Sequence, residues 1–221
     1  MIAGGRVRVN GVVADLGCKV SGREAIEVDG KRLQTPPNTH TYIILNKPRG
    51  VITTMSDEQG RPCVADILSE VAARVVPVGR LDRNSEGLLL FTDDGALAHK
   101  ITHPRYGVEK QYIVTLRGFA GGDLLERLRS VRALDGQPIK PVQIEVLEKT
   151  PDRSLLRFTL TEGRNHQIRR MCEQADAQVI RLKRVSLGGL KLRDLKAGQW
   201  RHLTRQEVSA LKSLVQRECA D

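Results

Sequence analysis

The chain has 221 residues, of which 40% are hydrophobic and 28% charged, a balance typical of globular rather than disordered proteins. Its formal net charge of +10 fits a polyanionic partner, because Lys and Arg neutralise phosphates and release their counterions, but charge alone fits a merely basic soluble protein equally well. Four scattered Cys without a C-x-x-C pair argue against a zinc site and a disulfide framework. With no apolar run near the roughly 20 residues that span a bilayer, we expect a cytoplasmic enzyme or binding protein.

The first 34 residues are predicted to form a small basic segment. Residues 6–11 alternate Arg with Val and end in Asn-Gly, the strongest short hairpin signal, and residues 26–30 repeat this form. Residues 34–39 have the composition of a linker. We therefore divide the chain into residues 1–34 and a main domain over residues 35–221.

The main domain is organised around residues 78–92, where a polar, Gly-bounded loop precedes an apolar run. The run over residues 88–91 fits a strand buried on both faces, although its periodicity also fits a helix. The loop holds Asp82 between Arg80 and Arg83. A loop anchored by a buried strand often carries binding or catalytic groups. The alternative is a turn in which the Asp side chain bonds its own backbone.

Strands and separate helices alternate irregularly through the rest of the domain. We predict strands at residues 42–46, 51–54, 109–116, 142–147, 155–160, 179–185 and 198–204, and helices at 65–71, 96–101, 124–129, 165–175 and 207–215. Asp93 and Asp94 are expected to form a turn and cap the next helix, and Asn165 and Thr204 to cap later ones. The absence of strict βαβ alternation predicts an α+β fold with a largely antiparallel sheet.

Several motifs resemble the bacterial ribosomal-RNA pseudouridine synthases. The longest is Gly-Arg-Leu-Asp-x-x-Ser-x-Gly-Leu-Leu-Leu-Phe-Thr-x-Asp-Gly at residues 79–95. The others, in order, are Asn-Lys-Pro-x-Gly at 46–50, Lys-x-Tyr at 110–112, Glu-Gly-Arg-Asn-His-Gln-Ile-Arg-Arg-Met at 162–171, Arg-Leu-Lys-Arg-Val at 181–185 and Gly-x-Trp-Arg-x-Leu-Thr at 198–204. The resemblance implies the synthase catalytic domain, with a cleft across a central mixed, largely antiparallel sheet. It also implies that residues 1–34 are a shortened alpha-L-type RNA-binding segment, the alternative being a strand pair that only caps the next domain.

The resemblance implies an isomerase that converts uridine in RNA to pseudouridine without a metal or cofactor. Asp82 matches the catalytic carboxylate, which can attack the sugar carbon, take a sugar proton or stabilise positive charge there. Arg169 matches the cation expected to keep that carboxylate ionised. Tyr112 matches a Tyr that lies against the target base, and Leu182 matches an apolar wall of the pocket. Without the resemblance, these three residues fit a solvated helix face and ordinary core positions.

Ribosomal RNA is the implied partner, and the target uridine must leave its stack at a cost of a few kcal/mol. Cations around the pocket can compensate by holding the flanking phosphates. The candidates for RNA binding are Arg80, Arg83, Lys110, Arg164, Arg170, Lys183 and Arg184, with Asn165 and His166 adding hydrogen bonds.

Three functional classes stay open at this point. A synthase acting on large-subunit ribosomal RNA is favoured, with small-subunit RNA as the alternative target and a monomer as the expected state. A non-catalytic RNA-binding or ribosome-assembly protein on the same fold is the second class. A glycoside hydrolase is the third, but it usually needs two facing carboxylates, and the sequence identifies no partner for Asp82.

Overall fold

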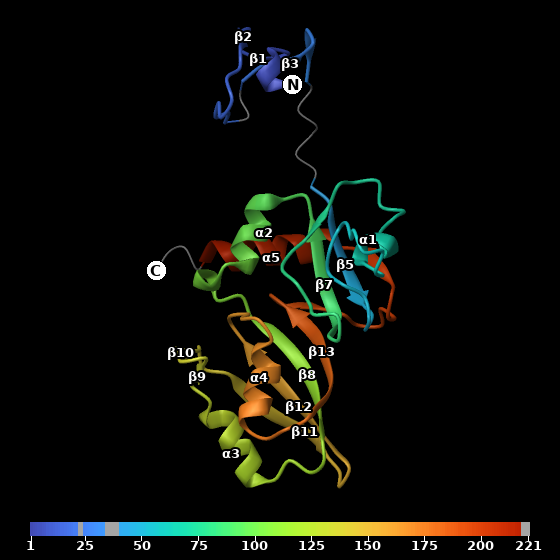
Figure 1. The fold of residues 1–221 in the computed structure, drawn as a ribbon, viewed down its shortest axis with the longest axis vertical. Helices are drawn as coiled ribbons and strands as arrows, with labels where there is room; N and C mark the ends of the chain where they lie inside the picture. The colour runs from blue at the N-terminus through green and yellow to red at the C-terminus, as the bar shows by residue number, and fades with distance from the viewer. Residues whose placement is uncertain (22–23, 34–39, 218–221) are drawn as a thin grey trace. The chain divides into compact units, whose positions relative to one another are not determined.

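The computed structural model describes residues 1–21, 24–33 and 40–217 (Figure 1). Its contacts divide the chain into two units, Met1–His40 and the residues from Thr41 onward. The predicted linker at residues 34–39 and the predicted boundary at residue 34 lie outside the described residues. The two units are described separately.

The first unit is a small antiparallel sheet with the order β2-β1-β3-β4. Its elements are η1 (Ile2–Gly4), β1 (Val7–Val9), β2 (Val12–Val13), β3 (Ile26–Val28) and β4 (Lys31–Arg32). Asn10 and Gly11 both have positive φ, and so do Asp29 and Gly30, as type I′ hairpin turns require. Both predicted hairpins are therefore confirmed. Among the described residues of this unit, Ala14 is the one buried hydrophobic side chain, so the unit has almost no core of its own.

The second unit is built on a nine-stranded sheet with the main order β11-β12-β8-β13-β7-β5-β15. These strands are β5 (Tyr42–Lys47), β7 (Glu86–Thr92), β8 (Lys110–Arg117), β11 (Gln143–Lys149), β12 (Arg153–Leu160), β13 (Val179–Leu187) and β15 (Trp200–His202), with β6 (Val76–Pro77) beside β7 and β14 (Leu190–Lys191) beside β13. The pair β13–β7 is parallel, and the other strand pairs are antiparallel. The predicted α+β class with a mixed, largely antiparallel sheet is confirmed.

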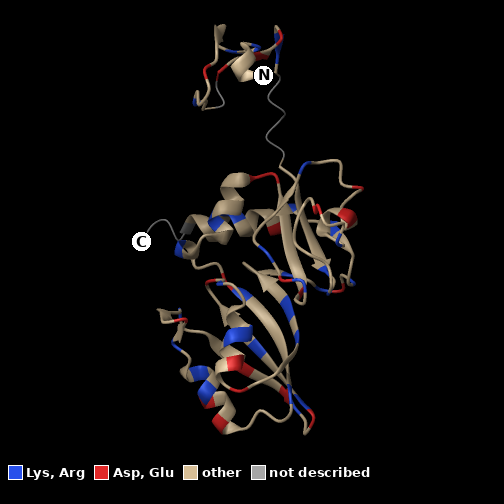
Figure 2. Ribbon diagram, viewed as in Figure 1, with Lys and Arg blue, Asp and Glu red and all other residues tan. Residues whose placement is uncertain are grey.

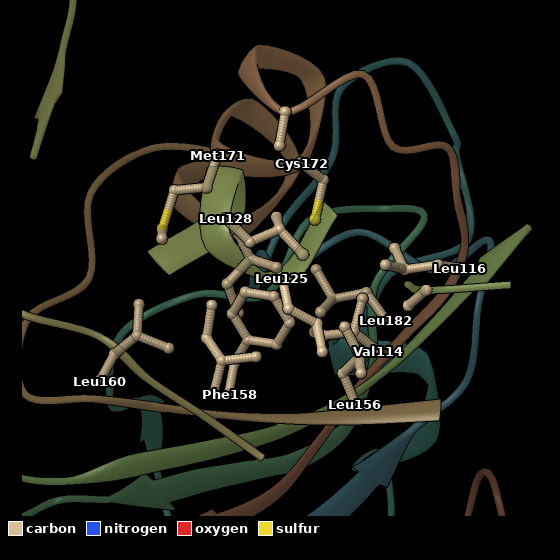
Figure 3. Packing of buried hydrophobic residues seen from close by; sticks show 14 of the residues in the cluster. Val114, Leu116, Leu125, Leu128, Leu156, Phe158, Leu160, Met171, Cys172 and Leu182 are labelled. Atoms are coloured by element: carbon tan, nitrogen blue, oxygen red, sulfur yellow. The ribbon is translucent and has the colours of Figure 1, made fainter. Parts of the chain in front are cut away.

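Helices cover the sheet on separate patches. They are α1 (Val64–Ile67), α2 (Gly95–Thr102), η2 (Pro104–Tyr106), α3 (Gly122–Ser130), α4 (Gln167–Gln174) and α5 (Arg205–Arg217), and a short ladder of β9 (Ala133–Leu134) and β10 (Gln137–Pro138) lies outside the main sheet. Helices α3 and α4 bury Leu128 and Met171 against Val114, Phe158 and Leu182 of the strands beneath (Figure 3). This core fixes α4, and with it the loop that precedes α4, over β8 and β13.

Strand β7 is buried along its whole length because both of its faces are covered. Leu88 and Leu90 pack in a cluster with residues of α2 and α5. Leu89 and Phe91 pack on the other face, in a cluster that includes Val64 of α1. The prediction of a doubly buried strand at residues 88–91 is therefore confirmed.

The capping predictions are confirmed at two helices, while one predicted strand is wrong. Asp94 accepts from the Leu97 amide at 2.9 Å to cap α2, and Thr204 forms a reciprocal cap with Glu207 at α5. Residues 51–54 form only an isolated bridge at Ile52.

Among the described residues, no helix combines the length and the apolar character needed to cross a membrane.

Candidate active site

A cavity of about 440 Å³ opens between the loop before β7, the central strands and the start of α4. Its walls include Asp82 and Ser85 from the loop, Tyr112 from β8 and Leu182 from β13. The volume lies in the range of small-ligand sites in proteins and is sufficient for one nucleotide. The structure thus brings Asp82, predicted to be catalytic, to one cavity with Tyr112 and Leu182, which were predicted to support it.

The Asp82 loop is held by contacts from segments distant in sequence. Thr53 bonds both backbone groups of Leu81, donating its hydroxyl to the carbonyl at 2.7 Å and accepting from the amide at 3.3 Å. The Gly50 amide donates to the Arg83 carbonyl at 2.8 Å. At the far end of the loop, Arg181 forms two hydrogen bonds with Glu86, at 2.7 and 2.8 Å. With backbone contacts at Leu81 and Arg83 and the Glu86 side chain held by Arg181, the loop gives Asp82 a defined position.

The Asp82 carboxylate has a partly exposed position and two polar neighbours. Ser85 donates its hydroxyl to one carboxylate oxygen at 3.3 Å. The Nε2 atom of His166 lies 3.4 Å from the other oxygen, an ion pair when the imidazole is protonated. Both contacts are long, so the carboxylate keeps acceptor capacity for a bound molecule.

The expected ion pair between Arg169 and Asp82 is not present. Arg169 instead donates from Nη2 to the carbonyl oxygen of Asn84 at 3.0 Å, and it does not line the cavity. Its role in this structure is to hold the loop backbone two residues beyond Asp82. The helix also begins differently from the prediction, because His166 rather than Asn165 occupies the cap position, with a left-handed φ of 53°. That conformation ends the preceding turn and brings the imidazole to Asp82.

The buried cation beneath the loop is Lys47, which the sequence analysis did not select. Its side chain is fully buried at the end of β5, and Nζ donates to the carbonyls of Pro48 at 3.0 Å and Ser85 at 2.9 Å. Burial lowers the pKa of Lys47 to about 8, and attraction to Asp82 and Glu86 opposes that shift. Lys47 therefore carries a positive charge at neutral pH and ties the loop to β5.

Stability should depend on pH through Lys47. Its pKa in the folded protein lies below its usual value of 10.5, so between about pH 8 and 10.5 the unfolded chain binds more protons at this group. The contribution of Lys47 to the unfolding free energy should consequently rise with pH across this window and be lost again as the pH falls to 8. The measurement is urea unfolding followed by the fluorescence of Trp200, the single Trp.

The matched variant is Lys47→Met, in which every other titrating group is retained. The unfolding free energy of the wild type relative to Lys47→Met should grow between pH 8 and 10.5. A difference that stays constant across that window would mean that burial does not shift the proton affinity of Lys47.

The sheet face beneath the cavity carries paired side chains from β8 and β13. In their antiparallel register, Leu182 lies opposite Val114 and Arg184 opposite Tyr112. Since alternate residues of a strand share a face, Lys110 projects on the same side as Tyr112. Lys110, Tyr112, Leu182 and Arg184 all line the cavity. This face can therefore surround a planar base with one ring, one apolar wall and two cations.

The other residues predicted to bind RNA fall into two groups. Arg80, Arg164, Asn165 and His166 line the cavity, and all except the half-buried Arg164 are exposed. Arg83, Arg170 and Lys183 do not line it. Arg170 forms an ion pair with Asp135, and Arg164 is engaged by Glu162 and by backbone carbonyls of β10. Arg184 differs most from the prediction, because it is buried rather than placed on the surface at the mouth.

Comparisons with known proteins agree with this arrangement. The model of the RNA pseudouridylate synthase family matches residues 41–174. A Bacillus subtilis protein named ribosomal large subunit pseudouridine synthase B is 41% identical over 97% of this chain and 88% of its own length. The chain belongs to the RNA pseudouridylate synthase family. Another relative, an uncharacterized RNA pseudouridine synthase of Aquifex aeolicus, is 39% identical over 96% of this chain and 85% of its own length.

A solved structure supports the family fold over nearly the whole chain. A crystal structure described as a pseudouridylate synthase aligns with a TM-score of 0.71 and 29% identity, covering 95% of this chain and 90% of the other. The family match itself runs from the start of β5 to the end of α4. It therefore includes Asp82, Tyr112 and Arg169, whereas Leu182 and Arg184 lie beyond it on β13.

The synthase cavity also contains a second carboxylate that the sequence analysis missed. Glu162 is buried in the cavity wall, and its Oε1 accepts from the Gln167 side chain at 2.9 Å and from the Lys140 amide at 3.1 Å. The motif before α4 contains this Glu, but only the fold reveals that it shares a cavity with Asp82. Within the described residues, no group of three or more His, Cys, Asp or Glu side chains is arranged to hold a metal ion.

Proposed function

We propose that this protein isomerises a uridine of large-subunit ribosomal RNA to pseudouridine, with Asp82 as the catalytic carboxylate. In this reaction the glycosidic bond breaks, the uracil turns within the cavity and its C5 atom joins the ribose. Asp82 supplies the negative charge beside the anomeric carbon, which becomes electron-poor as the uracil leaves. The reaction is redox-neutral overall, and we propose that it requires no metal or cofactor.

The observation that carries this proposal is the common cavity of Asp82, Tyr112 and Leu182. The carboxylate comes from a loop whose backbone is held by Thr53, Gly50 and Lys47. Tyr112 offers a ring on which the base can stack, and Leu182 an apolar wall against its other parts. The similarity to the large-subunit synthase of Bacillus subtilis supports the choice of ribosomal RNA as substrate.

Recognition of RNA is assigned to exposed groups around the cavity. Arg80 lines the cavity and is exposed, as are Asn165 and His166, so these three can contact the nucleotides that flank a flipped uridine. Figure 2 shows further Lys and Arg along β13 and on α4. These residues, which include Arg170 and Lys183, can hold phosphates farther from the cavity.

The first unit is proposed to add a further RNA contact to a monomeric enzyme. Its described part carries the exposed cations Arg8 and Lys19 on or beside the small sheet. Within this unit the side chains of the sheet are half-buried or exposed, so its cations can contact phosphates. Removal of residues 1–33 should therefore weaken RNA binding while leaving the cavity of the second unit intact.

The deciding experiment is a map of pseudouridine across ribosomal RNA from cells with and without this protein. We expect one or a few large-subunit positions to lose pseudouridine in the deletion strain and to regain it when the purified protein is added. Loss confined to small-subunit RNA would refute the proposed target. Unchanged maps, together with RNA binding by the purified protein, would favour a non-catalytic RNA-binding protein.

Glu162 gives a second reaction a structural basis, because hydrolysis of a glycosidic bond usually uses two carboxylates. In that reaction, water would replace uracil on the ribose and free uracil would appear. The hydrogen bonds of Glu162 to Gln167 and Lys140 favour a supporting role instead. Release of free uracil in proportion to uridine consumed would overturn the isomerase assignment.

A further inference from the structure

Arg184 has an unusual position in the sheet. It pairs with Gly87 of β7 on one side and with Tyr112 of β8 on the other. The register with β8 shifts between Arg184 and Ser186, as it does at a β-bulge. Arg184 itself precedes the shift and keeps the regular register, on the same face as Leu182, so its side chain reaches the cavity floor from a central strand.

The Arg184 guanidinium is buried with part of its hydrogen-bonding capacity unused. The residue is 3% exposed, and its Nε donates to the Leu88 carbonyl at 2.7 Å. Its Nη2 atom is the single buried side-chain nitrogen or oxygen in the described part of the chain that has no partner. Buried charged donors without an acceptor are costly, so they are rare unless they serve a function.

A second cation adds to the positive charge of this floor. Lys110 donates from Nζ to the Val108 carbonyl at 2.7 Å. Burial, together with the nearby charges of Arg184 and Lys140, lowers the pKa of Lys110 to about 8, while Glu162 opposes the shift. The floor thus holds two like charges close together, an arrangement that a bound anion would stabilise.

We propose that Arg184 is a catalytic residue that binds a carbonyl oxygen of the target uracil and stabilises the negative charge the base acquires. This inference rests on the proposed uridine isomerisation. When the C1′–N1 bond breaks, its electron pair stays with the uracil and spreads onto the O2 and O4 carbonyl oxygens. The unpaired Nη2 donor of Arg184 then meets an oxygen that is more negative than in the uridine, and Lys110 contributes a second positive charge.

The contact between Arg184 and the uracil oxygen weakens as the reaction is completed. The ring carbon C5 forms the new bond to C1′, the hydrogen of C5 leaves as a proton, and N1 takes up a proton. The base is then neutral again, with the same atoms as at the start. Arg184 therefore binds the intermediate more tightly than substrate or product, which is the condition for a rate effect.

The test compares Arg184→Met with the wild type on two RNA substrates. One is a large-subunit ribosomal RNA transcript, and the other is the same transcript made with 5-fluorouridine. Fluorine withdraws electrons and stabilises the departing uracil anion without help from the protein. With saturating enzyme, Arg184→Met should slow uridine consumption about 100-fold. The loss should be clearly smaller on the fluorinated transcript, and RNA affinity in filter binding should be unchanged.

Two further variants separate this role from structural effects. Arg184→Lys keeps the charge but loses the planar fork, and we expect about a tenfold loss of rate. If Arg184→Met fails to fold, the rates of Arg184→Lys on the two transcripts test the proposal instead. Arg157→Met removes an Arg of strand β12, separated from β13 by β8, that pairs with Glu145 at 2.5 Å, and it should retain wild-type rates.

Three results would refute the proposal, each for a different reason. Weaker RNA binding at an unchanged saturated rate would make Arg184 a phosphate contact and refute the proposal. Equal losses on the two transcripts would show that Arg184 only positions other groups, which also refutes it. If the wild type forms no pseudouridine on any ribosomal RNA, the proposed function fails, and this inference fails with it.

Discussion

Asp82→Asn is expected to abolish pseudouridine formation while leaving RNA binding and folding nearly unchanged. The substitution keeps the size of the side chain and removes the negative charge that the reaction needs beside the anomeric carbon. Loss of a group that reacts directly with substrate typically lowers the rate by about 10⁴-fold or more. The measurement is single-turnover conversion of uridine in ribosomal RNA transcripts at saturating enzyme.

The structure explains why this variant should stay folded. Asp82 is partly exposed, and its contacts with Ser85 and His166 are long, at 3.3 and 3.4 Å. An amide can still accept from the Ser85 hydroxyl, so the unfolding free energy should change by less than about 1 kcal/mol. Asp123→Asn, on the exposed start of α3, is the matched control and should keep full activity. Substantial activity in Asp82→Asn would remove Asp82 from the chemistry.

Local pattern was sufficient to predict the elements that carry the site. The apolar run before Thr92 predicted a doubly buried strand, and the polar residues before it predicted the loop that the strand supports. Alternation along residues 109–116 placed Tyr112 on one face with Val114 and Leu116. In both cases the signal lies within a few neighbouring residues, although for residues 88–91 the periodicity alone fitted a helix as well as a strand.

The contacts that hold the catalytic loop could not be predicted in the same way. Lys47 precedes a Pro and has the sequence environment of a turn residue. In the fold its side chain is buried and donates a hydrogen bond to the carbonyl oxygen of Ser85, 38 positions away. The motif predicts that Arg169 lies near the Asp82 loop. It does not determine whether the guanidinium contacts the Asp82 carboxylate or, as observed, the Asn84 carbonyl. His166 reaches Asp82 because its backbone adopts a left-handed conformation.

For Arg184, the sequence pattern contained information on its position that the prediction did not use. Alternation along β13 places Arg184 on the same face as Leu182, the residue predicted to line the pocket. That relation alone would have moved Arg184 from the surface to the cavity. The burial of its guanidinium and the lack of an acceptor for Nη2 depend on the surrounding fold and have no mark in the sequence.

Gly87→Ala is expected to cause the largest loss of stability of any single methyl addition in this sheet. Gly87 has φ of +106°, and a Cβ built there would lie 2.1 Å from the Arg184 carbonyl oxygen and 2.8 Å from the Arg184 amide nitrogen. Both neighbours are backbone atoms of the central strand β13, so they cannot turn aside as a side chain would. Accommodation requires β13 to separate from β7, and the unfolding free energy should fall by more than about 3 kcal/mol.

Gly189→Ala is the control that separates the effect of the close contact between Gly87 and the Arg184 backbone from the effect of a positive φ. Gly189 follows β13 in the turn to β14, has a similarly positive φ of +82°, and a Cβ there would have no atom within 4 Å. Its substitution should cost about 1 kcal/mol, the penalty for a left-handed conformation alone. Urea unfolding monitored by Trp200, which lies on β15 of the same sheet, measures both variants. Equal losses would mean that β7 and β13 can separate freely, and then Arg184 would not be held rigidly at the cavity floor.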